Sequence, residues 1–206
     1  LSHFAIQTNA KIVSDLQYTA TDTIYIIKTL THSSSLSSEL IAGIKSGARI
    51  IIGSAILMPR LILQDINQFN VSIIGINPTL LKLYTDYLER HNEELMTLKQ
   101  INVSGSLFYK LLFNRSKKVF KYAKIYNAYG LTEAGPRVSM QTPEFCSACS
   151  VGIPIEGVNV CIVGDDNCEL KPNQLGNVLV KTPCLFSDYV SGNKSEVVIK
   201  ECVLNT

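Results

Sequence analysis

The sequence predicts an α/β fold, with a doubly wound, mainly parallel sheet followed by a small antiparallel β unit. Two observations support this prediction. Short apolar runs alternate with longer amphipathic segments across residues 22–128, which is the pattern of strands joined by helices. The short runs are apolar almost throughout, as expected of parallel strands that helices cover on both faces. Right-handed crossovers between such strands produce an open doubly wound sheet.

The first predicted elements are a helix, a strand and a loop. Residues 2–16 are predicted to be helical, because Ser2 can cap their amino terminus. Residues 22–28 (DTIYIIK) are apolar and β-branched, which favours a strand. The serine-rich segment 32–38 (HSSSLSS) is predicted to be a loop between these elements and the next helix.

A regular alternation follows this loop. A helix is expected over residues 38–46, with Gly47 ending it. Residues 48–52 (ARIII) read as a strand, and residues 59–69 as a helix that has a proline in its first turn.

The same alternation continues to residue 128. Residues 71–76 (VSIIGI) read as a strand, and residues 78–91 show apolar residues at helical spacing. The remaining elements are a strand at 98–104, a helix at 107–121 and a strand at 124–128.

The pattern changes near residues 142–150, where a loop interrupts it. Short strands separated by polar turns follow, with no helical segment between them, which indicates an antiparallel unit. We therefore expect an α/β subdomain at residues 1–142 and an incomplete β subdomain at residues 150–206. The strands expected in the second unit are 159–163, 177–181 and 196–203.

The composition is that of a packed globular protein. Of the 206 residues, 46% are apolar and 17% are charged, and the net charge is +2. A charge so near zero argues against nucleic acid or an anionic membrane as the main partner. No apolar run reaches the roughly 18–20 residues of a membrane span, and residues 1–16 do not resemble a signal peptide. A cytoplasmic location is therefore expected.

The six cysteines all lie in the last third of the chain. Cys146 and Cys149 form a CxxC motif, but no second such motif and no nearby histidine completes a zinc site. We expect all six to be free thiols without metal, as in a reducing compartment.

Two loops should lie beyond the carboxyl ends of the strands, where ligands bind in open α/β sheets. In VSGS, residues 103–106, small side chains let a ligand approach the backbone. An ordinary tight turn between a strand and a helix explains the same residues, so this loop alone is a weak signal.

The second loop, YNAYGLTEAG at residues 126–135, carries more chemistry. The ring of Tyr129 can face a base, the hydroxyl of Thr132 can donate to a phosphate oxygen, and the carboxylate of Glu133 can hold Mg²⁺. A turn in which Gly130 supplies backbone freedom and Tyr129 packs fits equally well. The chemistry of these residues alone favours neither the ligand-binding loop nor the structural turn.

YNAYGLTE closely resembles the signature of the adenylate-forming superfamily, which includes acyl-CoA synthetases, aryl and fatty acyl ligases, luciferases and adenylation domains of peptide synthetases. The resemblance extends in order over nearly the whole chain. The other matching segments are LSHFAIQTN, DTIYIIKTLTHSSSLSSELIAGIKSGARIII, VSIIGINPTLL, LKQINVSGSLF and SVGIPIEGVNVCIV followed by LGNVLVK.

The resemblance implies part of an AMP-forming acid–thiol ligase. Such an enzyme activates a small carboxylic acid with ATP and Mg²⁺, as in fatty acid metabolism. It then passes the acyl group from the adenylate to coenzyme A or to the phosphopantetheine of an acyl carrier protein. Two alternatives stay open: a non-catalytic synthetase-like binding or scaffold module, and an amino-acid adenylation domain.

Site residues follow from the resemblance position by position. His32, Thr132 and Glu133 would be catalytic, with Glu133 binding Mg²⁺. The nucleotide would contact Ser104, Gly105, Ser106, Asn127, Ala128, Tyr129, Gly130 and Thr132. The acyl pocket would be formed by His32, Ser34, Ser104, Gly105 and Ala128.

Three parts of the family pattern lie outside these residues: the phosphate loop, the ribose-binding aspartate and the C-terminal lysine. We therefore expect an internal fragment of the N-terminal domain that is inactive alone. Within the chain, Asn177 stands where glutamate is usual, and a single glycine lies between Ser104 and Ser106 where two are commoner.

The resemblance also bears on the substrate. Amino-acid adenylation domains place an aspartate where this chain has Ser34, counting back from Gly47-Ala48. A serine cannot neutralise a buried ammonium group. The expected substrate is a fatty or aryl acid with an uncharged tail, and not an α-amino acid.

Overall fold

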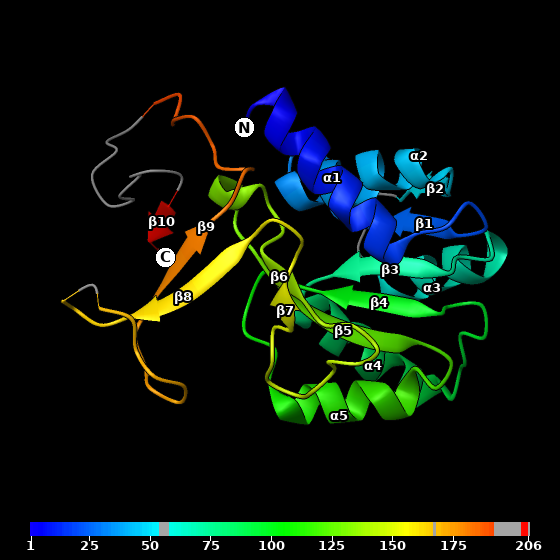
Figure 1. Ribbon diagram of the computed structural model, residues 1–206. Coiled ribbons are helices and arrows are strands. Elements are labelled where there is room, and N and C mark those ends of the chain that lie inside the picture. Colours follow the sequence, from blue (N-terminus) through cyan, green and yellow to red (C-terminus); the bar gives the residue numbers. More distant parts are fainter. Residues whose placement is uncertain (54–57, 167, 192–202, 206) are drawn as a thin grey trace.

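The computed structural model describes residues 1–53, 58–166, 168–191 and 203–205. It confirms the α/β fold with a mainly parallel sheet and a separate antiparallel unit (Figure 1). The large sheet contains β1 (Thr23–Ile26), β2 (Arg49–Ile52), β3 (Ile73–Ile76), β4 (Gln100–Val103), β5 (Lys124–Tyr129), β6 (Ser139–Met140) and β7 (Ile153–Pro154). The small sheet contains β8 (Asn159–Val163), β9 (Asn177–Lys181) and β10 (Val203–Asn205).

The helices lie mostly in the first 120 residues. The α-helices are α1 (His3–Gln17), α2 (Ala42–Ser46), α3 (Pro59–Gln68), α4 (Pro78–His91) and α5 (Lys110–Val119). Two further helical segments are the π-helix η1 (Ser34–Ile41) and the short 3₁₀-helix η2 (Thr132–Ala134).

The order of strands in the large sheet is β2-β1-β3-β4-β5-β6-β7. Strands β1 to β5 run parallel, and β6 and β7 add to this sheet in antiparallel sense. The chain runs from β1 outward to β2 and then returns to the other side of β1 as β3, which makes a topological switch point. The loops that follow β1, β4 and β5 therefore meet at one edge of the sheet.

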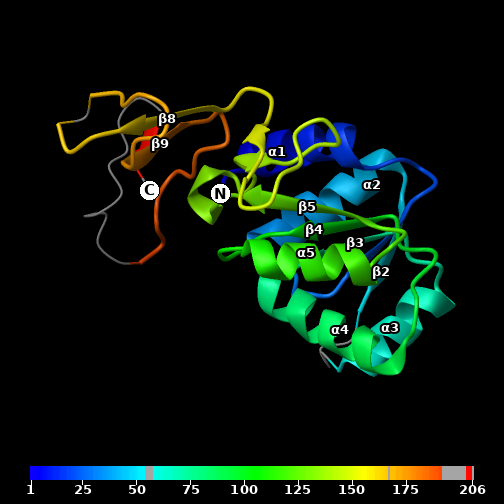
Figure 2. The ribbon, with the colours of Figure 1, turned by 90° about the horizontal axis from the view of Figure 1, so that it is seen from below.

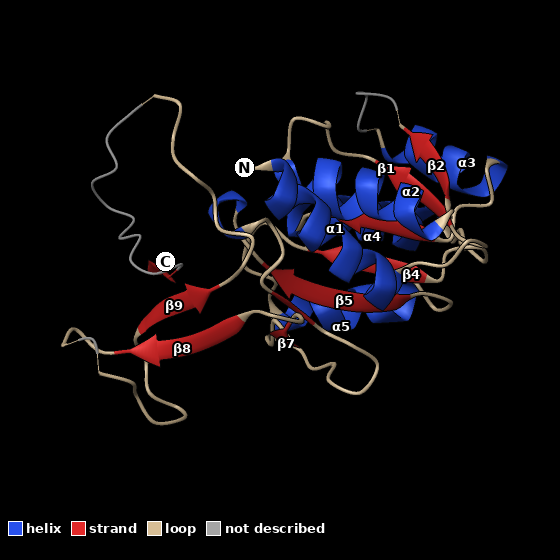
Figure 3. Ribbon diagram, turned by 45° about the horizontal axis from the view of Figure 1, so that its top comes forward, coloured by secondary structure: helices blue, strands red, loops and turns tan. Residues whose placement is uncertain are grey.

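Helices cover both faces of the large sheet. Helices α1 and α2 lie over one face and α3, α4 and α5 over the other (Figures 2 and 3). The largest apolar cluster fills the space under α3, α4 and α5, where Tyr84, Ile74 and Leu81 are fully buried. A second cluster packs α1 against Ile24 and Ile26 of β1. This two-faced burial explains why the strands read as apolar throughout.

Two predicted helix boundaries, the cap at Ser2 and the end at Gly47, are confirmed, whereas the helix predicted at 107–121 is the shorter α5. Ser2 caps α1, since its hydroxyl accepts a hydrogen bond from the Ala5 N–H at 3.1 Å. Gly47 ends α2 with a φ of 76°, a left-handed conformation that glycine adopts without strain. Asn77 caps α4 by accepting from the Leu80 N–H at 2.8 Å.

The prediction of a loop at HSSSLSS is wrong from Ser34 onward, because η1 begins there and runs directly into α2. Ser35, Ser37 and Ser38 are buried, and their small side chains let η1 lie close against α1. Tyr18 at the end of α1 donates its hydroxyl to the Ser38 carbonyl at 2.8 Å. Tertiary packing thus overrides the turn preference of serine.

The two-residue strands β6 and β7 had no counterpart in the predicted pattern. β6 pairs with β5 through Ala128 and Met140, and β7 pairs with β6. The second predicted unit, residues 150–206, thus begins with a strand of the large sheet, and its own sheet begins at Asn159.

The strands expected at 159–163 and 177–181 are confirmed as β8 and β9. The strand expected at 196–203 lies outside the described residues except for its last residue, which belongs to β10. A third apolar cluster joins the two sheets, since Val180 and Phe186 pack with Ala134 and Val138.

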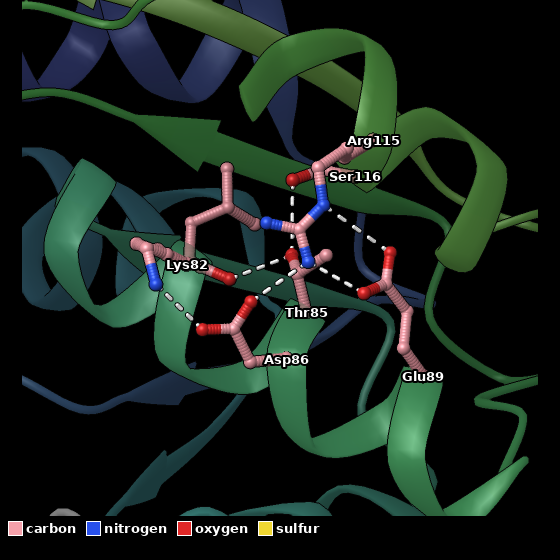
Figure 4. Close-up of polar contacts among 7 residues, drawn as sticks. Lys82, Thr85, Asp86, Glu89, Arg115 and Ser116 are labelled. Atoms are coloured by element: carbon pink, nitrogen blue, oxygen red, sulfur yellow. Dashed lines mark hydrogen bonds and ion pairs between the residues drawn. The ribbon is translucent and has the colours of Figure 1, made fainter. Parts of the chain in front are cut away.

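Arg115 of α5 forms ion pairs with two carboxylates of α4 (Figure 4). Its guanidinium lies 2.8 Å from Asp86 Oδ1 and 2.5 Å from Glu89 Oε2. Beside these ion pairs the buried hydroxyls of Thr85 and Ser116 are 3.0 Å apart. Exposed ion pairs contribute little each, so the buried contacts between the helices carry most of this packing.

Across the described ranges, no helix combines the length and the apolarity needed to cross a bilayer.

Candidate functional site

Two adjoining cavities open at the edge where the loops after β1, β4 and β5 meet. The first, about 170 Å³, is lined by His32, Ser33, Ser34, Ser104, Gly105, Tyr129, Gly130, Leu131, Thr132, Pro136 and Arg137. The second, about 360 Å³, is lined by Gly105, Ser106, Leu107, Phe108, Asn127, Ala128, Tyr129, Gly130, Cys149 and Val151. Every predicted site residue except Glu133 therefore lines one cavity or both.

The first cavity is mainly polar at its mouth. His32 and Thr132 are exposed there, and Ser34 and Ser104 are partly buried. The hydroxyl oxygens of Ser33 and Thr132 lie 2.8 Å apart and join the loop before η1 to the turn η2. The mouth thus presents hydroxyl groups and an imidazole, which suit an anionic ligand.

The second cavity has apolar walls. Ala128 and Phe108 are buried in these walls, and Tyr129 separates this cavity from the first. A flat aromatic ligand in this cavity would contact apolar side chains and the ring of Tyr129.

Asn127 holds the far wall of the second cavity in place. Its side-chain amide donates to the Ser150 carbonyl at 2.8 Å, and its backbone N–H donates to Gln141 Oε1 at 2.8 Å. Both bonds tie β5 to the loop after β6, which carries Cys149 and Val151.

Two glycines shape the shared wall for different reasons. Gly105 has a φ of 96°, where a side chain is strained, although a Cβ there would meet no atom within 4 Å. At Gly130 a Cβ would lie 1.8 Å from the Pro136 carbonyl oxygen, so only glycine permits this approach of the two backbone segments.

Glu133 is the predicted site residue that lines neither cavity. It lies on η2 beside Thr132, and its carboxylate accepts a hydrogen bond from the Tyr189 hydroxyl at 2.8 Å. This hydrogen bond raises the pKa of Tyr189 above its ordinary value. The Phe186 N–H donates to the Glu133 carbonyl at 2.8 Å, which holds the segment after β9 against η2.

Glu133 suits the magnesium role that the resemblance implies. Mg²⁺ is usually held by one or two carboxylates together with substrate phosphates and water. Glu133 is partly exposed and next to the cavity mouth, and its partner Tyr189 is a neutral donor that a cation can displace. In the part of the chain that the structure describes, no cluster of three acidic, histidine or cysteine residues has the form of a metal site.

The cysteines of the CxxC motif are exposed free thiols, and Cys149 lines the second cavity. Cys161, Cys168 and Cys184 are also free. Cys202 lies outside the described residues, so the expectation of six free thiols stays a prediction.

Arg137 is a cavity residue that the sequence reasoning missed. It follows the YNAYGLTEAG loop after Pro136, lines the first cavity and is only 6% exposed. The available signal was a single cation inside the otherwise uncharged stretch PRVSM. Tyr189 was also missed, because nothing in the sequence links it to Glu133.

Comparisons with known proteins agree on one family of enzymes. The profile of a family described as AMP-binding enzyme matches residues 1–190. A 4-coumarate–CoA ligase of Humulus lupulus is 26% identical over 183 residues, which are 86% of this chain and 33% of that protein. The chain thus spans about a third of the length of this curated relative.

Solved structures support the same fold. The crystal structure of the anthranilate CoA ligase AuaEII with anthranoyl-AMP superposes with a TM-score of 0.89 at 19% identity, covering 98% of this chain and 40% of that chain. The adenylation domain of a keto acid-selecting peptide synthetase module, bound to keto acyl adenylate, gives a TM-score of 0.88 at 17% identity, covering 100% and 47%.

Proposed function

The chain belongs to the AMP-binding enzyme family, and from this premise we propose that it carries the adenine and acyl subsites of an AMP-forming acid–thiol ligase. The family resemblance of YNAYGLTE, LKQINVSGSLF and the segment with His32 is thereby confirmed at the level of the family. The activity, the acid and the thiol acceptor are proposals for the whole protein.

One observation supports this proposal most. Residues from three loops far apart in the sequence, at His32, at Ser104 and at Thr132, line a single cavity. That cavity shares a wall of Gly105, Tyr129 and Gly130 with a second, apolar cavity. Adjacent polar and apolar spaces suit a ligand with a charged reacting group and an aromatic base.

We assign adenine to the second cavity, against the ring of Tyr129. Ser106, Asn127 and Ala128 also line this cavity. The acyl carboxylate and the α-phosphate occupy the first cavity, near His32 and Thr132.

In the first half-reaction a carboxylate oxygen of the acid attacks the α-phosphorus of ATP. The bond between the α-phosphorus and the bridging oxygen breaks, and pyrophosphate leaves. The Thr132 hydroxyl donates to a phosphate oxygen, and His32 orients the acid. Such phosphoryl transfer depends mainly on positioning and charge neutralisation.

Glu133 would hold Mg²⁺, which neutralises phosphate charge when it is bound. In the second half-reaction a thiol sulfur attacks the acyl carbon, the bond to the adenylate oxygen breaks, and AMP leaves. The thiol of coenzyme A and that of a carrier protein remain the two candidate acceptors.

Ser34 lines the first cavity, where an aspartate would be needed to bind an α-ammonium group. Glu39 is the nearest acidic residue along the chain, but Lys28 already pairs with it at 3.0 Å. We propose an acid without an α-ammonium group as the substrate.

The test is acid-dependent exchange of pyrophosphate into ATP by the full-length protein, with fatty, aryl and α-amino acids compared by kcat/KM. Exchange with a fatty or aryl acid that falls in Glu133→Ala supports the proposal. A non-catalytic module predicts adenylate binding without exchange by any acid. The highest kcat/KM for an α-amino acid would show that the reading of Ser34 is wrong.

A further inference from the structure

We propose that Arg137 makes the first cavity selective for short carboxylic acids that carry a second anionic group. This inference rests on the proposed acid-activating function and names a substrate class for it. It revises the uncharged tail expected from the sequence, since Ser34 argues only against an ammonium group.

Arg137 is held in place by its backbone and not by its side chain. The Asn9 amide of α1 donates to the Arg137 carbonyl at 3.0 Å, and the Arg137 N–H lies 3.3 Å from Asn9 Oδ1. Among the residues that the structure describes, none forms a hydrogen bond or ion pair with the guanidinium. Five N–H donors of a residue that is only 6% exposed are thus left for a ligand.

The charges around Arg137 leave one positive charge uncompensated. Tyr18 and Glu39 are the titratable groups that act on Arg137. The Tyr18 hydroxyl already donates to the Ser38 carbonyl, and Glu39 Oε1 already lies 3.0 Å from the Lys28 Nζ. The other Glu39 oxygen, Oε2, is buried and has no hydrogen-bond partner in the described structure, so Arg137 does not reach it. Lys28 is therefore the ion-pair partner of this carboxylate, and the guanidinium of Arg137 has none among the described residues, although buried charges are normally paired.

The position of Arg137 points to the tail of the acid rather than its reacting end. His32 and Thr132 are exposed at the mouth of the cavity, whereas Arg137 is buried and its backbone is hydrogen-bonded to Asn9 of α1. A linear acid with its reacting carboxylate near Thr132 would direct its far end toward the guanidinium. A planar guanidinium binds a carboxylate through two parallel hydrogen bonds.

The size of the cavity limits the length of such an acid. Its volume of about 170 Å³ lies below the range of roughly 300–1,000 Å³ that is usual for sites of drug-sized ligands. Short dicarboxylates such as butanedioate and hexanedioate are therefore the matched probes.

The test compares butanoate with butanedioate and hexanoate with hexanedioate in acid-dependent pyrophosphate exchange by the full-length protein. A dicarboxylate should exceed its matched monocarboxylate in kcat/KM by about tenfold or more, as charge-assisted hydrogen bonds predict. Arg137→Met should abolish this preference and leave the monocarboxylate equal or better. Arg90→Met, which removes an exposed guanidinium from α4, is the matched control and should change neither.

Several outcomes would overturn the inference. If monocarboxylates support exchange and dicarboxylates do not, the proposed function stands and the role of Arg137 is wrong. An equal loss for both acids in Arg137→Met would place the guanidinium at the reacting carboxylate or the phosphate instead. If no acid supports exchange, both proposals fail. Should Arg137→Met not fold, Arg137→Gln gives the same comparison with a neutral polar side chain.

Discussion

The hydroxyl of Ser33 lies 2.8 Å from that of Thr132, although 99 positions separate them in the chain. This contact joins the segment before η1 to the turn after β5 at the mouth of the first cavity. It places the Thr132 hydroxyl against the segment that precedes η1.

Thr132→Ala should lower kcat/KM for adenylation by about tenfold to a hundredfold, because a hydrogen bond to a charged phosphate is worth about 1.5–3 kcal/mol. Thr132→Ser should retain most of the activity, since it keeps the hydroxyl donor. Ser33→Ala is the control. It removes only the hydroxyl beside Thr132 and should lower kcat/KM by less than about tenfold. Equal losses in Ser33→Ala and Thr132→Ala would mean that the pair acts only to join the two loops.

Glu133→Ala should raise the Mg²⁺ concentration needed for half-maximal adenylation and lower turnover, while the melting temperature changes little. The reason is that Glu133 lies in a short, partly exposed turn and not in an apolar core. Activity titrated with Mg²⁺, together with thermal unfolding, measures both effects. Unchanged turnover at saturating Mg²⁺ would remove Glu133 from the metal role.

The bond from Tyr189 to Glu133 should be visible in a pH titration. The hydrogen bond to Glu133 raises the pKa of Tyr189, so folding favours the neutral phenol. Its contribution to stability is present below the ordinary pKa and is lost as the pH rises through the raised value.

In Glu133→Gln, Tyr189 should therefore ionise at lower pH than in the wild type. Tyrosinate absorbance measures this, with Tyr189→Phe subtracted to isolate the one residue. An identical titration curve in the variant would show that the bond does not persist in solution.

Tyr129→Ala should weaken binding of a non-hydrolysable acyl-adenylate analogue by about 1–3 kcal/mol, the usual contribution of a ring stacked on a base. Tyr129→Phe keeps the ring and should bind nearly as well. Calorimetry decides between the two interpretations left open by the sequence. Equal affinity of wild type and Tyr129→Ala would mean that the ring only packs.

The two glycines of the shared wall should respond differently to alanine. Gly105→Ala should cost about 1–3 kcal/mol of unfolding free energy from its positive φ alone, because a Cβ meets nothing there. Gly130→Ala should cost about 3 kcal/mol or more, since a Cβ would overlap the Pro136 carbonyl and backbone cannot move aside cheaply. Denaturant unfolding measures both, and a smaller cost at Gly130 would contradict this account.

Much of the fold was readable from local pattern. Helix α4 was predicted with both of its boundaries, Pro78 and His91, because its apolar spacing is regular. Strands β6 and β7 were not predicted, because each has only two residues and so shows no hydrophobic periodicity. They are strands only through their pairing with β5 and with each other. The serines of η1 were misread for a related reason, since only burial against α1 makes small polar residues good helix residues there.

The sequence by itself determined the family, the doubly wound sheet and a set of candidate site residues of which all but Glu133 line two adjoining cavities. Those features depend on motif spacing and on hydrophobic period, which are local properties of a chain. Only the tertiary structure decided that Ser33 meets Thr132 and that Tyr189 meets Glu133. It also decided that Arg137 is buried while its guanidinium has no hydrogen-bond or ion-pair partner among the described residues. The side chains concerned come from segments far apart in the chain, and the free energy of a charge depends on which neighbours the fold brings beside it.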